Sequence, residues 1–307
     1  MEFNHSPVLL NAVVEHLQIH PGGRYLDGTL GGGGHSAEIL DRGGVVFGMD
    51  RDPNAIKAAQ RRLSSYSEFT AIHGKFGNME ELVQTHAPFD GILLDLGVSS
   101  PQLDQPLRGF SVHHDGPVDM RMDPGQDMDA SVLLDQLDEA SLADILFQYG
   151  EEPRSRRIAR AIIAGRPWTS TVALAQCVAK ASGYRNSRTH PATRTFQALR
   201  ITVNDELSQL EHGIEAALQL LRKGGRLAVI TFHSLEDRLV KRRFAAAAGR
   251  GTPRDGYGNP ITPPIAKLVV PRGISGKIAD PENPRARSSR LRILELIAEL
   301  QSEAPPT

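Results

Sequence analysis

Short apolar runs alternate with stretches of helical periodicity over the first hundred residues. Helical spacing is clear from residue 37 onward and again over 53–63. The apolar runs are too short for helices, and several finish on an aspartate. They are Arg24–Asp27, Val45–Asp50, 69–74 and 89–96. Such an alternation of strands and helices predicts a parallel, doubly wound α/β sheet.

Both ends of the chain add elements to this pattern. Ser6 and Pro7 precede apolar residues at helical spacing, which predicts a helix capped by Ser6 with Pro7 at its first position. The segment 249–284 is rich in Gly and Pro and predicts a long surface loop with one strand at 267–270. A final alternation of apolar and polar residues over 291–296 predicts an edge strand that closes the sheet.

The middle of the chain interrupts the sheet pattern. Near Leu103 the alternation stops, polar loops and amphipathic helices follow, and strand character returns only at 226–232. We therefore predict an inserted helical domain over 104–194. Residues 1–103 and 195–307 would form the domain that contains the sheet.

Charge becomes informative when it is counted by segment. The whole chain has a formal net charge of −1, with 40% hydrophobic and 23% charged residues, as in an ordinary globular protein. Residues 151–200, however, hold ten Arg and Lys against two acidic residues, and residues 238–292 hold thirteen against three. Solvated helix faces are one explanation. Two Arg-rich segments favour a partner lined with phosphates, because guanidinium groups match phosphate oxygens.

Cysteine content and apolar length indicate where the protein works. The single cysteine, Cys177, excludes an intramolecular disulfide and suits a reducing compartment, and its expected role is helix packing rather than reactivity. The N-terminal sequence does not resemble a secretory signal, and no stretch approaches the roughly 18 apolar residues of a membrane span. We expect a cytoplasmic protein without a membrane partner.

Four consecutive glycines, 31–34, stand between the first strand and the helix after it. They let a ligand approach the backbone closely and leave the helix N-terminus free to bind polar groups, which predicts a cofactor cradle. No window matches the G-x-G-x-x-G fingerprint of dinucleotide enzymes. The sequence Asp27-x-x-x-Gly31-x-Gly33 is instead similar to the first motif of class I methyltransferases. Asp50 is placed to accept hydrogen bonds from a ribose diol, or to act as a surface cap.

Four longer motifs resemble those of one family, the MraW/RsmH family of bacterial 16S rRNA cytosine-N4 methyltransferases. They lie at 95–103, 190–197, 232–237 and 283–289, and the resemblance runs from His5 to the C-terminal strand. It implies a class I methyltransferase fold, a Rossmann-like doubly wound sheet with an inserted helical domain that binds RNA. The implied cofactor is S-adenosyl-L-methionine. The implied partner is the small ribosomal subunit, in which a decoding-region cytidine of 16S rRNA is methylated.

The resemblance also implies roles for individual residues. Cofactor contacts fall by position on Gly33, Gly34, His35, Asp50, Phe76, Asp95 and Gln102. Candidates for substrate contact are Arg194, His233, Arg285 and Arg287. No metal ligand set is expected.

Several of these residues have plainer interpretations. Phe76 suits the hydrophobic core, and His35 suits a helix cap. Ser234 with Asp237 predicts a capping box at a helix start, whether or not His233 faces the substrate. The three candidate arginines are phosphate contacts or only surface charges.

The predicted chemistry is transfer of an electrophilic methyl group to an amino nitrogen held in line with it. Asp95, or backbone carbonyls over 96–100, would accept the amino hydrogens and stabilise positive charge on the nitrogen. A strong base is not required, because the methylated ammonium loses its proton readily. Asp95 is the candidate catalytic residue.

Three other classes of protein are alternatives to this prediction. An amino-methyltransferase of DNA would normally carry Pro-Pro-aromatic after the fourth-strand acid, where this chain has Leu96, Gly97 and Val98. An RNA-binding protein that senses a nucleotide would bind cofactor and transfer nothing. A dehydrogenase is disfavoured by the missing glycine fingerprint. The sequence leaves a homodimer open.

Overall fold

The computed structural model describes residues 7–184, 189–253, 255–258 and 260–299 of the 307-residue chain. The chain divides into two compact units, Met1–Gly97 with Leu207–Thr307, and Val98–Glu206. The sequence places the insert at 104–194. The second unit begins earlier than that range and ends later, because the segments on either side of it belong to the same compact group of helices.

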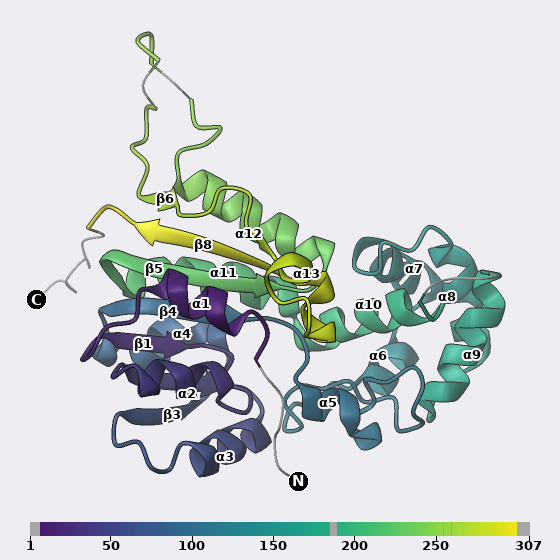
Figure 1. Ribbon diagram of the computed structural model, residues 1–307. Coiled ribbons are helices and arrows are strands. Elements are labelled where there is room, and N and C mark those ends of the chain that lie inside the picture. Colours follow the sequence, from purple (N-terminus) through teal and green to yellow (C-terminus); the bar gives the residue numbers. More distant parts are fainter. Residues whose placement is uncertain (1–6, 185–188, 254, 259, 300–307) are drawn as a thin grey trace, which may run out of the picture. The chain divides into compact units, whose positions relative to one another are not determined.

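One sheet forms the centre of the first unit, with strands in the order β3-β2-β1-β4-β5-β8-β6 (Figure 1). Strands β1 to β5 are parallel to one another, whereas β8 is antiparallel to β5 and β6. The bounds are β1 (Arg24–Asp27), β2 (Val45–Asp50), β3 (Phe69–His73), β4 (Phe89–Asp95), β5 (Leu221–Thr231), β6 (Ala266–Leu268), β7 (Ile274–Ser275), which pairs with β8, and β8 (Arg290–Leu296). The doubly wound sheet that the sequence predicts is confirmed.

Successive side chains along each strand enter two different hydrophobic cores. Leu26 and Leu94 belong to the core on one face, and Tyr25 and Leu93 belong to the core on the other. All four are fully buried. Burial on both faces explains why these strands read as continuous apolar runs rather than as alternating ones.

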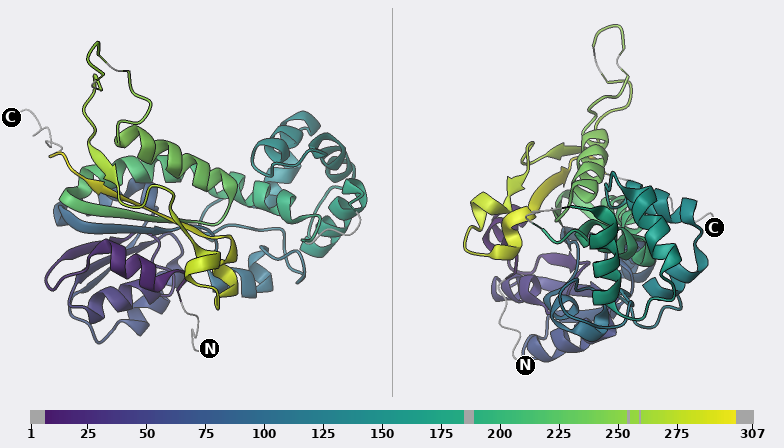
Figure 2. Two further views of the ribbon diagram at one scale, coloured as in Figure 1. Left: turned by 45° about the horizontal axis from the view of Figure 1, so that its top comes forward. Right: turned by 90° about the vertical axis from the view of Figure 1, so that its right-hand side faces the viewer.

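Helices cover both faces of this sheet (Figure 2). Helices α1 and α2 contribute to the core that contains Tyr25, and α4, α11 and α12 contribute to the core that contains Leu26. The bounds are α1 (Leu10–Leu17), α2 (Gly34–Asp41), α3 (Pro53–Arg62), η1 (Phe76–Asn78), α4 (Met79–Val83), η2 (Gln84–His86), α11 (Glu206–Leu220), α12 (Ser234–Ala247), α13 (Gly276–Ala279) and η4 (Pro284–Ser288).

Two elements at the ends of the chain differ from their predicted form. Helix α1 begins at Leu10, not at Pro7, because Leu9 has a left-handed backbone conformation (φ 55°) that cannot continue a right-handed helix. The C-terminal strand β8 is not an edge strand. Segment 249–284 supplies β6, which pairs with the side of β8 that faces away from β5.

The second unit consists of short helices around a core of its own. Leu146, Ile158, Val178 and Leu199 are fully buried in that core. The helices are α5 (Ser100–Asp104), η3 (Pro106–Arg108), α6 (Ala130–Gln136), α7 (Glu139–Gln148), α8 (Ser155–Ala164), α9 (Thr171–Ser182) and α10 (Thr193–Asn204). Cys177 lies in α9, where its thiol donates to the Ala161 carbonyl oxygen at 3.6 Å. Among the described residues, no helix is long and apolar enough to cross a membrane.

Truncation of a leucine in the sheet should measure how much the first unit depends on its two-sided core. Leu94 is fully buried in β4, and Leu94→Ala should lower the free energy of unfolding by about 2–5 kcal/mol because it leaves a cavity. Leu82 is 39% exposed, so the same substitution there should cost less than about 1 kcal/mol. Urea titration followed by circular dichroism measures both; equal losses would contradict the assigned burial.

Candidate active site

Three aspartates lie at the carboxyl ends of neighbouring parallel strands in the first unit. Asp27 ends β1, Asp50 ends β2 and Asp95 ends β4. Because β1 pairs with both β2 and β4 in parallel, the three ends share one edge of the sheet. This is the edge at which open α/β sheets bind their ligands.

The glycine loop follows β1 at this edge and leads into α2. Gly33 is the N-cap of α2 with φ 73°, a left-handed conformation that favours glycine. A Cβ on Gly34 would lie 2.4 Å from Cγ of Pro7, so the absence of a side chain there admits the N-terminal segment. The Gly31 N–H donates to Asp50 Oδ2 at 2.8 Å. The loop is therefore fixed from both sides by contacts within the protein.

Asp27 is buried beneath the loop and has its own hydrogen-bond donors. The Ser36 hydroxyl donates to Oδ2 at 2.8 Å, and the Thr29 N–H donates to Oδ1 at 3.3 Å. Burial raises the pKa of Asp27 to about 6, although these bonds oppose the shift. Burial also raises the pKa of Asp50 to about 6, against the hydrogen bonds from Asp52 and Gly31.

Asp95 differs from the other two because one of its oxygens is buried without a partner. Oδ1 has no hydrogen bond to any described residue, while the Asp95 N–H donates to the Thr29 hydroxyl at 2.6 Å. Its side chain is 23% exposed. Desolvation, with repulsion from Asp27 and Glu236, raises the pKa of Asp95 well above its ordinary value. Asp95 thus keeps acceptor capacity that the described residues do not use.

His35 faces Asp95 from the first turn of α2. Nε2 lies 3.1 Å from the Val8 carbonyl oxygen, which can only accept, so Nε2 carries the hydrogen. Burial lowers the pKa of His35 to about 4, which leaves the ring neutral and Nδ1 with a lone pair. Nδ1 lies 3.8 Å from Asp95 Oδ2. Two acceptors thus face each other, an arrangement that suits a cationic or hydrogen-donating group of a ligand.

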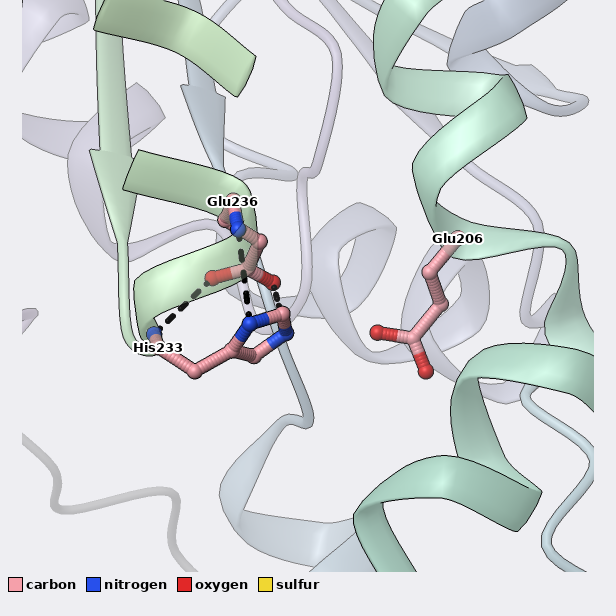
Figure 3. Close-up of side chains that lie close together, drawn as sticks. All are labelled: Glu206, His233 and Glu236. Atoms are coloured by element: carbon pink, nitrogen blue, oxygen red, sulfur yellow. Dashed lines mark hydrogen bonds and ion pairs between the residues drawn. The ribbon is translucent and has the colours of Figure 1, made fainter. Parts of the chain in front are cut away.

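The interpretation of His35 as a helix cap is wrong, because the N-cap of α2 is Gly33 and makes no side-chain bond. A histidine caps α12 instead. His233 Nδ1 accepts from the Glu236 N–H at 3.4 Å, and Glu236 Oε2 accepts from the His233 N–H at 3.2 Å (Figure 3). The same oxygen accepts from the Phe232 N–H at 2.7 Å. The predicted capping box of Ser234 with Asp237 is therefore one residue out of register.

Asp237 has a different partner from the one that the capping box assigned to it. It forms a two-pronged ion pair with buried Arg292 in β8, at 2.7 and 2.9 Å. The preceding turn η4 holds Arg285, which is partly buried, and Arg287, which is exposed. Since the first residue of β8 pairs with the last residue of β5, these arginines lie at the edge of the sheet that carries the aspartates.

The remaining predicted residues are Phe76, which follows β3 in the first unit, and two residues of the second unit. Phe76 is partly buried against the core, and a Cβ on Gly213 of α11 would come within 2.6 Å of its ring. Gln102 and Arg194 belong to the second unit. Gln102 is buried and accepts from the Ser99 N–H at 2.9 Å. Arg194 is half exposed, with Nη1 3.9 Å from Glu152 Oε2.

Sequence reasoning missed the residues that hold the predicted ones in place. Thr29 and Ser36 secure Asp95 and Asp27, and Val8 orients His35. Glu236 secures the start of α12. Hydroxyl residues beside the glycines were a usable signal, whereas a backbone carbonyl such as that of Val8 leaves no trace in the sequence.

The sheet order, with antiparallel β8 inserted beside β5, defines together with the glycine loop and the strand-end acids a class I methyltransferase. The chain belongs to the MraW methylase family, whose sequence model it matches over residues 2–297. Membership of this family and the class I fold make S-adenosylmethionine its methyl donor.

Curated relatives resemble the chain over most of their length. Proteins named "Ribosomal RNA small subunit methyltransferase H" are 45% identical in Dehalococcoides mccartyi, covering 96% of this chain and 87% of that protein, and 49% identical in Gluconobacter oxydans, covering 94% and 92%. Among solved structures, a putative rRNA methylase of Clostridium thermocellum has a TM-score of 0.44 at 11% identity over 94% of each chain. A putative methyltransferase of Streptococcus mutans in complex with SAH has a TM-score of 0.42 at 11% identity, covering 95% of this chain and 100% of that one.

Affinity for S-adenosylmethionine should depend on pH through Asp50. A ribose hydroxyl that donates to Asp50 favours the ionised carboxylate, so binding should release protons wherever Asp50 is protonated in the free protein. With the pKa raised to about 6, affinity should level off above about pH 6 and fall below it by up to about tenfold per pH unit.

Calorimetric titration between about pH 5 and pH 8 would measure this dependence. Asp50→Asn should weaken binding at pH 8 and flatten the profile, whereas Asp41→Asn, at an exposed position, should leave the profile unchanged. A wild-type affinity that is constant down to about pH 5 would exclude a titrating carboxylate at the ligand.

Proposed function

We propose that the chain methylates 16S rRNA of the small ribosomal subunit, at the N4 amino nitrogen of a cytidine in the decoding region. The names of its relatives support the substrate class, and the motif resemblance supports the base and the atom. The observation that carries the proposal is Asp95, which has one oxygen, Oδ1, without a partner among the described residues and the other, Oδ2, 3.8 Å from Nδ1 of His35. An amino group that must be oriented needs such acceptors.

The residues at the sheet edge fit a cofactor with cationic and hydrogen-donating groups. Gly33, Gly34 and His35 would hold its methionine portion and Asp50 its ribose, while Phe76 would lie beside the adenine. The family resemblance also assigns Asp95 and Gln102 to the cofactor. Gln102 lies in the second unit, and its contact with the cofactor stays a prediction. When bound, S-adenosylmethionine supplies a methyl group on a positively charged sulfur.

The protein's main task in this reaction is to orient the nucleophile. The lone pair of a cytosine amino group is delocalised into the ring, so the group must be turned until the lone pair points along the S–CH3 bond. Asp95 would accept an amino hydrogen and stabilise the positive charge that develops as the N–C bond forms and the C–S bond breaks. Because its pKa is raised, the Asp95 carboxylate is a stronger base than an ordinary aspartate and can take the proton that the methylated nitrogen loses.

The RNA must present an unpaired base, because pairing engages the amino group and extrusion of a base costs a few kcal/mol. Arg285 and Arg287 at the sheet edge would contact phosphates, as would Arg194 in the second unit. His233, whose ring caps α12, would also face the substrate. The helical unit would bind RNA around the target nucleotide.

Methyl transfer to small subunits that lack the modification tests this function directly. Wild-type protein with labelled S-adenosylmethionine should yield N4-methylcytidine. Asp95→Ala should lower kcat/KM by at least about 100-fold, because it removes an acceptor that acts in the transition state. Asp95→Asn keeps a carbonyl oxygen and should fall between Asp95→Ala and wild type. Nucleoside analysis by mass spectrometry identifies the product.

The matched control is Asp41→Asn, which removes an exposed carboxylate and should transfer methyl at the wild-type rate. Cofactor binding without transfer to subunits or to bare rRNA would indicate a non-catalytic RNA-binding protein instead. A methylated base other than N4-methylcytidine would retain the reaction class and refute the proposed atom.

A further inference from the structure

A fully buried carboxylate organises one surface of the second unit. Glu152 has an exposed fraction of 0% and lies just before α8. Its Oε1 accepts from the Tyr184 hydroxyl and from the Arg154 N–H, both at 2.9 Å. Burial and the nearby Glu152 raise the pKa of Tyr184, which keeps the phenol protonated as a donor. This carboxylate fixes the turn before α8 and the residues after α9.

Three arginines lie near this carboxylate or near the residues that it holds. The Arg154 guanidinium lies 4.2 Å from the centre of the Tyr184 ring and donates to the Ser182 carbonyl at the end of α9. A Cβ on Gly183 would lie 3.6 Å from Arg154 Nη1 and 3.8 Å from Arg157 Nη1, so both guanidinium groups reach one spot.

Arg194 approaches the same carboxylate from α10, at 3.9 Å from Oε2, which is too far for a hydrogen bond. Its side chain is 52% exposed. Arg154 and Arg157 are exposed, and neither forms an ion pair with a described residue. One guanidinium group thus approaches the buried carboxylate and two lie beside the end of α9, which leaves a positive surface with unused N–H donors.

We propose that this surface, formed by Arg154, Arg157, Tyr184 and Arg194 on Glu152, binds the sugar-phosphate backbone of the substrate RNA. The inference rests on the proposed function and names the RNA-binding surface of the helical unit. Arg154 is held by the Tyr184 ring and the Ser182 carbonyl, and a guanidinium group so held matches phosphate oxygens with two hydrogen bonds at little cost in side-chain entropy, while Arg157 and Arg194 add positive charge beside it. The buried carboxylate supplies that fixation without offering its charge to a partner.

Arg157→Gln and Arg194→Gln test the surface, because they remove a charge and keep most of the side chain. Each should weaken binding to protein-free 16S rRNA by roughly threefold to tenfold near 0.1 M salt and reduce the slope of log affinity against log salt by roughly one. Arg61→Gln, at an exposed position of α3 in the first unit, is the matched control and should change neither. Filter binding over a salt series measures both quantities.

The outcomes separate this inference from the proposed function. Wild-type methyl transfer with unchanged affinity and salt slope in both variants would overturn the surface and leave the function intact. Wild-type protein that transfers no methyl, yet loses RNA affinity in the variants, would support the surface and refute the function. Affinity lost for whole subunits but kept for protein-free rRNA would mean that the surface binds an acidic protein, and would overturn the inference.

Asp280 lies far from the glycine loop in sequence but contacts the N-terminal segment beside that loop. Asp280 Oδ2 accepts from the Leu9 N–H at 3.0 Å and from the Asn283 side chain at 3.2 Å. Leu9 is a non-glycine residue in the left-handed region, which is unfavourable unless it is held there. The next carbonyl back, that of Val8, is the one that sets the His35 tautomer. We infer that Asp280 is a positioning residue for His35.

Nitrogen NMR of histidine-labelled protein, with cofactor titration, tests this role without relying on activity. Asp280→Ala should shift the His35 ring signals away from the pure Nε2–H form and weaken S-adenosylmethionine binding by roughly tenfold. Asp280→Asn keeps an oxygen that accepts from Leu9 and should restore both. Unchanged His35 signals in Asp280→Ala would overturn the inference, as would equal losses in the two variants.

Discussion

The cost of burying carboxyl groups at the carboxyl edge of the sheet constrains the rest of the first unit. A carboxylate taken out of water must be paired, hydrogen-bonded or protonated. Burial raises the pKa values of Asp27 and Asp50, and a hydroxyl and backbone N–H groups offset part of that cost. Asp95 Oδ1 has no such donor among the described residues. The glycine loop supplies one of the donors through Gly31, and the unused acceptor capacity of Asp95 remains for chemistry.

Segments near both ends of the chain hold this loop and the helix after it. Pro7 occupies the space that the missing side chain of Gly34 provides, and Val8 sets the tautomer of His35. Asp280, from the segment between β7 and β8, holds Leu9. The N-terminal and C-terminal motifs, which look unrelated in the sequence, thus serve one structural purpose.

Sequence analysis succeeded where the determining pattern is local. The apolar runs and their terminal acids identify β1, β2 and β4, since burial on both faces and a polar tip are properties of a few adjacent residues. It failed where long-range pairing decides. β8 is an interior strand because β6 pairs with its outer side. β6 comes from a segment without periodicity, so the sequence does not indicate that pairing. His233 rather than Ser234 caps α12. The sequence does not decide between them, because a histidine and a serine can both accept that hydrogen bond.

Buried carboxyl groups have different roles in the two units. In the first unit, buried carboxyl groups create a site that attracts positive charge, which suits a sulfonium cofactor and a nitrogen that becomes cationic. In the second, buried Glu152 accepts from Tyr184, over whose ring Arg154 lies, and Arg194 approaches it. The net charge of −1 hides both arrangements. The first unit also carries positive charge at its sheet edge, since Arg285 and Arg287 lie beside the aspartates, so attraction for RNA need not be confined to the helical unit.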